Sequence, residues 1–256
     1  MKTMLVLLIF AGTAFYSHAQ DALAIVRQSR NRINAATTLT RSRWTITAKN
    51  GSTTEWLINQ YSKDGASGNS RTIVEFVQPA RVAGTRFLTI EEGDASNQWI
   101  FLPSIEKVRR IAASEGSGSF MGTDLSYDDI SSSDRDPNLD THVILREETY
   151  NGKLCYVIES RPKNSSYQYS KMVQWIEKSN WVNHKVELYD KRGAHVKTLV
   201  ILELRDVQGR LSPVRTRMIT TEKGTSTTII VEDLRYDQNI PESVFSTSYL
   251  ETGKVR

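Results

Sequence analysis

The sequence predicts a mainly β fold built on one curved antiparallel sheet of about eleven strands. After Thr38, apolar and polar residues alternate with a period of two through most of the chain, which is typical of strands with one buried face. Asn50-Gly51 and Asn151-Gly152 separate such runs and are strong hairpin signals. Strands do not alternate with helices, so a doubly wound parallel sheet is not expected. A sheet this long must curl to cover its apolar face, as a closed barrel or as a half-open barrel with a helical cover.

The first nineteen residues predict an export signal. Lys2 supplies a positive charge, residues 4–10 are apolar, and Ser17-His18-Ala19 places small residues where a signal peptidase cleaves. We expect cleavage before Gln20, which leaves residues 20–256 as one domain outside the cytoplasm. The apolar run is too short to span a membrane. No cysteine follows the expected cleavage point, so the protein is not expected to be a lipoprotein itself.

Residues 21–33 predict a helix that covers the sheet. Asp21 is the expected N-terminal cap, and Ala22, Ile25, Val26 and Ile33 supply an apolar side.

The expected strands fall into two groups on either side of a long loop. In the first group, alternation around residues 44–48, 56–58 and 74–76 is followed by short apolar runs at 86–90 and 98–102. The second group covers residues 143–150, 153–160, 171–177, 181–189, 194–204, 213–221 and 226–234. Neither a linker nor an exact repeat divides the two groups, so one domain is expected.

The loop between Pro103 and Ile130 is the least strand-like part of the chain. It carries a basic cluster, then small residues, then apolar residues among carboxylates: Lys107, Arg109, Arg110, Phe120, Met121, Asp124, Tyr127, Asp128 and Asp129. Core packing does not require such a segment, so it favours a functional loop. The three cations are expected either to be solvated or to contact lipid headgroups, an acidic partner or the nearby aspartates. Phe120, Met121 and Tyr127 are expected to lie at the mouth of a cavity.

Large apolar residues in the first group of strands are the candidate cavity lining. A curled sheet with such residues on its concave face can enclose a ligand, and it can equally hold an ordinary packed core. The candidates are Trp44, Ile46, Trp56, Ile58, Val74, Phe76, Leu88, Trp99 and Phe101.

Enzymatic chemistry has little support in the sequence. Residues 116–120 contain two serines but lack the G-x-S-x-G spacing of a nucleophile elbow. After the signal, the histidines are His142, His184 and His195, which are scattered. His184 alternates with apolar neighbours and is expected to face the interior or a cargo cavity. We expect no catalysis, with a hydrolase that uses the serine and aspartate loop as the less favoured alternative.

Composition excludes some further classes. The spacing of the aspartates between residues 124 and 136 does not match an EF-hand, and turn formation is favoured over metal binding, so no metal or other cofactor is expected. A net charge of +4 is too small to indicate nucleic-acid binding. The single cysteine, Cys155, lies in an apolar run and predicts a buried structural thiol.

Five motifs carry a resemblance to a known family. They are FVQPA at 76–80, GTRFL at 84–88, QWIFLP at 98–103, KVRRI at 107–111 and SFMGTDLSYDDI at 119–130. In order and spacing the chain resembles the outer-membrane lipoprotein-sorting proteins, the LolA/LolB-like periplasmic lipoprotein carriers. The resemblance covers essentially the whole chain after residue 19.

The resemblance implies both an architecture and a role. It implies a half-open β-barrel with helices over its concave side. The barrel would bind acyl chains of lipoproteins, or another lipid, and deliver them toward the outer membrane. An inner-membrane transporter and an outer-membrane acceptor are the implied partners. The alternative is an accessory subunit of an envelope transporter whose barrel is solidly packed.

Overall fold

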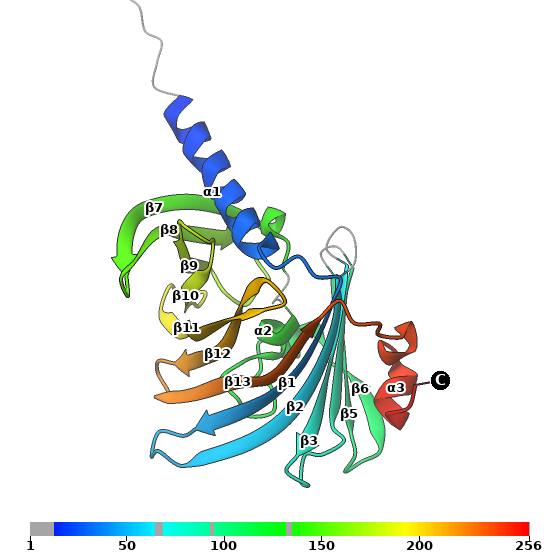
Figure 1. The fold of residues 1–256 in the computed structure, drawn as a ribbon. Coiled ribbons are helices and arrows are strands. Elements are labelled where there is room, and N and C mark those ends of the chain that lie inside the picture. Colours follow the sequence, from blue (N-terminus) through cyan, green and yellow to red (C-terminus); the bar gives the residue numbers. More distant parts are fainter. Residues whose placement is uncertain (1–12, 65–68, 93–94, 132–134, 256) are drawn as a thin grey trace, which may run out of the picture.

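The computed structural model describes residues 13–64, 69–92, 95–131 and 135–255, which form one curved antiparallel sheet (Figure 1). Most of the predicted export signal lies outside the described residues. Thirteen strands are present in the described part of the chain, and consecutive strands within each group are joined as hairpins. They are β1 (Thr37–Thr47), β2 (Thr53–Asp64), β3 (Ser70–Gln78), β4 (Arg86–Glu92), β5 (Ala95–Leu102), β6 (Lys107–Arg110), β7 (Asp140–Tyr150), β8 (Lys153–Pro162), β9 (Lys171–Glu177), β10 (Asn183–Tyr189), β11 (His195–Val207), β12 (Arg210–Thr220) and β13 (Thr225–Tyr236).

The sheet confirms the predicted fold class and corrects the strand count. The sequence predicts about eleven strands and assigns residues 107–110 to a loop, whereas these residues form the edge strand β6 on β5. At the predicted hairpin between β7 and β8, Asn151 and Gly152 have φ angles of 49° and 77°. Both lie in the left-handed region that a two-residue hairpin turn requires.

The order of the strands decides where the long connection runs. The sheet is ordered β6-β5-β4-β3-β2-β1-β13-β12-β11-β10-β9-β8-β7, so β1 pairs with β13 at its centre. Strands β6 and β7 are consecutive in the chain and lie at opposite edges. The connection between them, residues 111–139, therefore has to span the sheet, and in Figure 1 its described helix α2 lies inside the curve. It contains the short helices η2 (Ala113–Glu115), α2 (Tyr127–Ser131) and η4 (Pro137–Leu139).

The predicted N-terminal helix is present with different bounds. Helix α1 spans Thr13–Asn31, so Asp21 lies within it and does not cap its beginning. Its Ala22, Ile25 and Val26 side chains are buried against Ile158 of β8 and Ile176 of β9. The helix thus covers the β7–β9 end of the inner face. No helix in the described ranges is long and apolar enough to cross a membrane.

The C-terminal segment covers the opposite, outer face of strands β2–β6. Helices η5 (Glu242–Val244) and α3 (Thr247–Thr252) lie beside β5 and β6 outside the curve (Figure 1). Their buried residues pack on the outer face of β3 and β4, where Ile73 and Leu88 have no exposed surface. Strands β3 and β4 therefore bury both faces, with Val74 and Phe87 inside the curve and Ile73 and Leu88 outside it.

Candidate functional site

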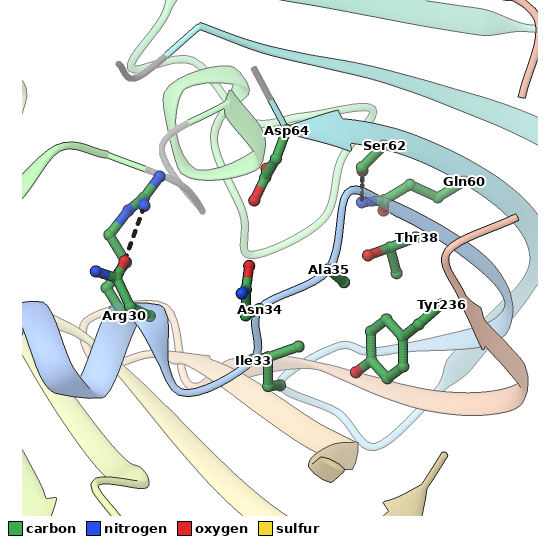
Figure 2. A pocket seen from close by; sticks show the side chains of 10 residues that line it. Arg30, Ile33, Asn34, Ala35, Thr38, Gln60, Ser62, Asp64 and Tyr236 are labelled. Atoms are coloured by element: carbon green, nitrogen blue, oxygen red, sulfur yellow. Dashed lines mark hydrogen bonds between the residues drawn. The ribbon is translucent and has the colours of Figure 1, made fainter. Parts of the chain in front are cut away.

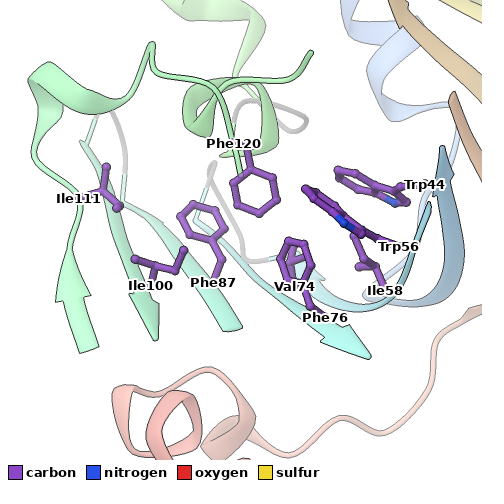
Figure 3. Close-up of a cluster of buried hydrophobic side chains, with 9 residues drawn as sticks. All are labelled: Trp44, Trp56, Ile58, Val74, Phe76, Phe87, Ile100, Ile111 and Phe120. Carbon is purple, nitrogen blue, oxygen red and sulfur yellow. The ribbon is translucent and has the colours of Figure 1, made fainter. Parts of the chain in front are cut away.

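The connection between β6 and β7 fills one half of the concave face. Phe120 is fully buried among the aromatic residues of β1–β4, with ring centroids 5.1 Å from Phe87 and 5.8 Å from Phe76 (Figure 3). Tyr127 stacks edge-on against Phe120 at 5.4 Å. The cluster comprises Trp44, Trp56, Ile58, Val74, Phe76, Phe87, Ile100, Ile111 and Phe120, with Ile46, Met121, Leu125 and Tyr127 packed against it. This half of the barrel is therefore a packed core.

Two buried aspartates anchor the connection to the sheet. The Asp124 carboxylate accepts hydrogen bonds from the hydroxyls of Thr220 (2.6 Å), Thr227 (2.8 Å) and Thr225, which lie on β12 and β13. The Asp129 carboxylate accepts hydrogen bonds from the Tyr169 hydroxyl (2.8 Å) and from Lys197 of β11 (2.7 Å).

The Tyr169 hydroxyl remains a proton donor in this arrangement. Burial, together with the adjacent Asp129 carboxylate, raises the pKa of Tyr169 far above its usual value. The aspartates therefore do not pair with the basic cluster. They are held by hydroxyls and by Lys197.

The other half of the concave face holds an apolar cavity of about 530 Å³. It lies between α1 and the inner faces of β7–β13, within the usual range of ~300–1,000 Å³ for ligand pockets. Leu125 and Ile229 line it and also pack against the aromatic cluster, so they form the wall between the two halves. The apolar lining is Val26, Ile33, Leu125, Pro137, Tyr167, Tyr169, Met172, Val186, Leu188, Leu199, Ile201, Pro213, Met218 and Ile229.

Polar groups are concentrated at α1 and the β7 edge of this cavity. Arg32 lines it, its guanidinium donates to the Leu211 carbonyl, and burial lowers the pKa of this side chain from its usual value. Arg135 forms an ion pair with Asp140 at 2.8 Å and stacks over the Tyr167 ring, 4.1 Å from its centroid. The cavity thus has an apolar body and a partly charged end.

The predicted lining residues fall into two sets. Trp44, Ile46, Trp56, Ile58, Val74 and Phe76 share the inner face and belong to the packed cluster or border it, so none of them lines the cavity. Leu88, Trp99 and Phe101 are on the outer face beneath the C-terminal helices. The prediction of one shared hollow fails for these three because the alternation along β4 and β5 places them opposite Phe87 and Ile100.

The basic cluster lies on the edge strand β6. Arg109 is paired with Glu115 at 2.7 Å, and Arg110 donates to Asn97 and stacks over Trp99. Lys107 is exposed. Because Asp124 and Asp129 have other partners, and Asp128 bonds to Gln98, the expected pairing of these cations with the aspartates does not form.

The hydrolase alternative gains no support from the geometry. The Ser119 hydroxyl donates to the Thr123 carbonyl at 2.6 Å. His142 bonds to Ser160, whose side chain is fully buried, and His184 bonds to Glu177 at 2.7 Å. His184 does not face the cavity because the register of β10 shifts between Asn183 and Lys185.

Metal ligation gains no support either. Among the described residues, no three or more His, Cys, Asp or Glu side chains are grouped to hold a metal ion.

The residues that line the open cavity were not predicted from the sequence, because the candidates came only from the first group of strands. Alternation is as clear in β11, where Leu199 and Ile201 face inward, as it is in β1. The large aromatic residues of the first group of strands were the basis of that prediction, and in the structure they fill the packed core.

Known proteins share this architecture. A family model described as "Uncharacterized protein" matches residues 68–252, more than half of the chain. No curated protein matches the sequence.

Three solved structures are similar over most of their length. A DUF1329 family protein from Desulfovibrio piger is 27% identical with a TM-score of 0.86, covering 91% of this chain and 99% of that chain. An outer membrane lipoprotein-sorting protein domain from Vibrio parahaemolyticus is 26% identical with the same TM-score and coverage. A LolA superfamily protein from Nitrosomonas europaea is 22% identical with a TM-score of 0.72, covering 89% and 98%, and it shows the shared fold.

Proposed function

The chain belongs to the family whose model matches residues 68–252, within the LolA/LolB-like outer-membrane lipoprotein-sorting proteins, and on this premise we propose that it is a non-enzymatic periplasmic carrier of acyl chains. Its cargo would be the acyl part of lipoproteins or of another lipid, delivered toward the outer membrane. The observation that carries this proposal is the apolar cavity of about 530 Å³ beneath α1.

The cavity suits an acyl chain energetically. Burial of each methylene contributes about 0.8 kcal/mol, so a chain enclosed by apolar side chains is held without covalent chemistry. Leu199, Ile201 and Met218 supply such surface from adjacent strands. The polar end near Arg32 and Arg135 would leave a headgroup hydrated or bonded while the chain is buried.

The aromatic residues of β1–β3 would contribute to lipid binding if the connection between β6 and β7 moved. Leu125 and Ile229 separate them from the open cavity. If Phe120, Met121 and Tyr127 withdraw, the inner face of β1–β5 joins the cavity and offers room for a second chain. The connection would then act as a gate, and Lys107, Arg109 and Arg110 on the exposed edge would contact headgroups or a membrane partner.

The packed half also favours a second candidate. The aromatic cluster around Phe120 is a solid core, as expected of an accessory subunit that acts by binding a transporter. In that case the protein has envelope partners and no lipid cargo. Direct measurement of lipid binding distinguishes the two candidates.

Neighbouring residues on β11 provide a matched test. Ile201 lines the cavity, whereas Leu202 is 44% exposed. Ile201→Asp is expected to abolish binding of a fluorescent fatty acid because it places a carboxylate against the chain. Leu202→Asp should leave binding unchanged. Circular dichroism of both variants checks that the sheet is retained. Absence of probe binding by the unaltered protein, or equal binding by Ile201→Asp, would favour the accessory subunit.

A further inference from the structure

A second cavity of about 590 Å³ adjoins the apolar one and is lined mostly by polar side chains (Figure 2). It lies between the end of α1 and the inner faces of β1 and β2, with Tyr236 of β13 at one side. Arg30 and Ile33 line both cavities. A molecule bound in the apolar cavity would therefore have its polar end next to this second space.

The chemistry of the second cavity is that of amides and hydroxyls. Gln60 donates through Nε2 to Ser62 at 3.3 Å, which leaves Oε1 of Gln60 as an acceptor. The side chains of Asn34 and Thr38 line the cavity and have no hydrogen-bond partner among the residues the structure describes. Figure 2 shows them converging on the same space as Gln60. Such groups both donate and accept hydrogen bonds.

The charges in the second cavity disfavour an anion. Arg30 and Asp64 supply one charge of each sign. Arg30 also lies in the last turn of α1, where the helix dipole is negative. Phosphate sites in proteins usually combine several cations or the N-terminus of a helix, and neither arrangement is found among the lining residues.

The polar character extends along the sheet in register. Thr38 of β1 is paired with Ser62, which is followed by Thr72 on β3 and then by Thr89 and Gln98 on β4 and β5. The next row toward the interior is apolar and contains Val74, Phe87 and Ile100. Among the residues that the structure describes, the hydroxyl of Thr89 and Oε1 of Gln98 are buried without a hydrogen-bond partner. This end of the concave face therefore offers polar groups where a packed core would not need them.

We propose that the second cavity binds an uncharged, hydroxyl-rich group, such as a sugar, that forms the headgroup of the cargo. The inference rests on the carrier function proposed above, because the acyl part would occupy the adjoining apolar cavity. Sugar hydroxyls match amide and hydroxyl side chains, which can donate to and accept from neighbouring hydroxyls on one ring. The cargo would thus be a glycosylated amphiphile.

Three ligands with one tail and different headgroups test the proposal. Dodecyl maltoside, dodecylphosphocholine and dodecyl phosphate are each titrated, below their micelle concentrations, against a bound fluorescent fatty acid. The maltoside is expected to compete about tenfold better than the other two, because its sugar forms two additional hydrogen bonds in the second cavity. Free maltose, which has no tail, is measured separately by calorimetry.

A double variant and a control variant test whether the preference for the maltoside arises from the second cavity. Thr38→Val with Gln60→Ala should weaken competition by the maltoside about tenfold and leave binding of the fatty acid unchanged. Asn59→Ala is the control, because Asn59 is adjacent to Gln60 on β2 and points to the other face. Melting temperatures verify that the variants fold.

Each outcome separates this inference from the carrier function. Binding of the fatty acid with equal competition by all three ligands, or with preference for dodecyl phosphate or dodecylphosphocholine, overturns the sugar headgroup and keeps the carrier. Binding of free maltose as tight as that of the maltoside overturns the link to a lipid. Failure of the unaltered protein to bind the fatty acid refutes the carrier function itself.

Discussion

Nζ of Lys197 on β11 lies 2.7 Å from Oδ2 of Asp129 on α2, and the two side chains are only 16% and 7% exposed. The same carboxylate accepts hydrogen bonds from the Tyr169 hydroxyl and from the backbone N–H of Ser126. With Asp124 bonded to threonines of β12 and β13, the connection between β6 and β7 is fastened across the centre of the sheet. Any movement of this connection as a gate has to break these contacts.

Loss of the Lys197 charge should destabilise the fold. Lys197→Met leaves the buried Asp129 carboxylate without its cation, and breaking a buried pair typically costs about 3–5 kcal/mol. We expect a value near 3 kcal/mol in urea unfolding, since Tyr169 still donates to Asp129. Adding Asp129→Asn to Lys197→Met removes the unpaired charge and should restore part of the loss. Additive costs in the double variant would show that the two residues are not coupled.

Truncation of Phe120 should measure how much the packed aromatic cluster contributes to the stability of the fold. Phe120 is fully buried between Phe76, Phe87 and Tyr127. Phe120→Ala is expected to lower the free energy of unfolding by ~3–5 kcal/mol because it leaves a cavity in a close-packed cluster. The control is Ile105→Ala at a residue that is 54% exposed, where a change within about 0.5 kcal/mol is expected. A small loss at Phe120 would mean that the neighbouring loop collapses into the space.

Charge reversal on β6 should affect transfer and not folding. Arg109 and Arg110 are exposed, and their partners Glu115 and Asn97 are accessible to solvent. Solvent-exposed ion pairs contribute little to stability. Arg109→Glu with Arg110→Glu should therefore leave the melting temperature nearly unchanged and slow lipid transfer between anionic vesicles. A large melting loss with normal transfer would assign the cluster a structural role.

Local patterns predicted the fold well because they record which face of each strand is buried. Alternation marked the strands, and Asn151-Gly152 marked a hairpin that the structure contains. The edge strand β6 was missed because Val108 is the only apolar residue among its four. The N-terminal helix was predicted, but it begins at Thr13 and ends at Asn31, so Asp21 lies within it and does not cap it.

The position of the cavity was harder to predict from the sequence, because it depends on contacts between residues that are far apart in the chain. The pairing of β1 with β13 sends β6 and β7 to opposite edges, and this directs Phe120 into the aromatic half. Local alternation carries no information about that pairing. His184 shows the same limit, because a register shift in β10 turns it toward Glu177.

Asp128 should make stability depend on pH in a defined direction. Burial raises the pKa of Asp128 above its usual value, the Gln98 amide opposes this shift, and the nearby Asp129 adds to it. Between the ordinary pKa and the raised one, the folded protein binds more protons at this site than the unfolded chain. Asp128 therefore lowers the free energy of unfolding as pH rises through that interval, and the cost is complete above the raised pKa. Asp128→Asn carries no charge and should be more stable than the unaltered protein at neutral pH.

The difference between Asp128→Asn and the unaltered protein should shrink as the pH falls toward the ordinary aspartate pKa of 3.8. Urea unfolding at a series of pH values measures it. Asp233→Asn is the control, since the side chain of Asp233 is 41% exposed on β13. A Cβ on Gly116 would clash with the carboxylate of Asp128, so Gly116→Ala should displace this side chain. A stability difference that stays constant with pH would show that Asp128 is ionised in the fold without penalty, and that the polar contacts from Gln98 outweigh its burial.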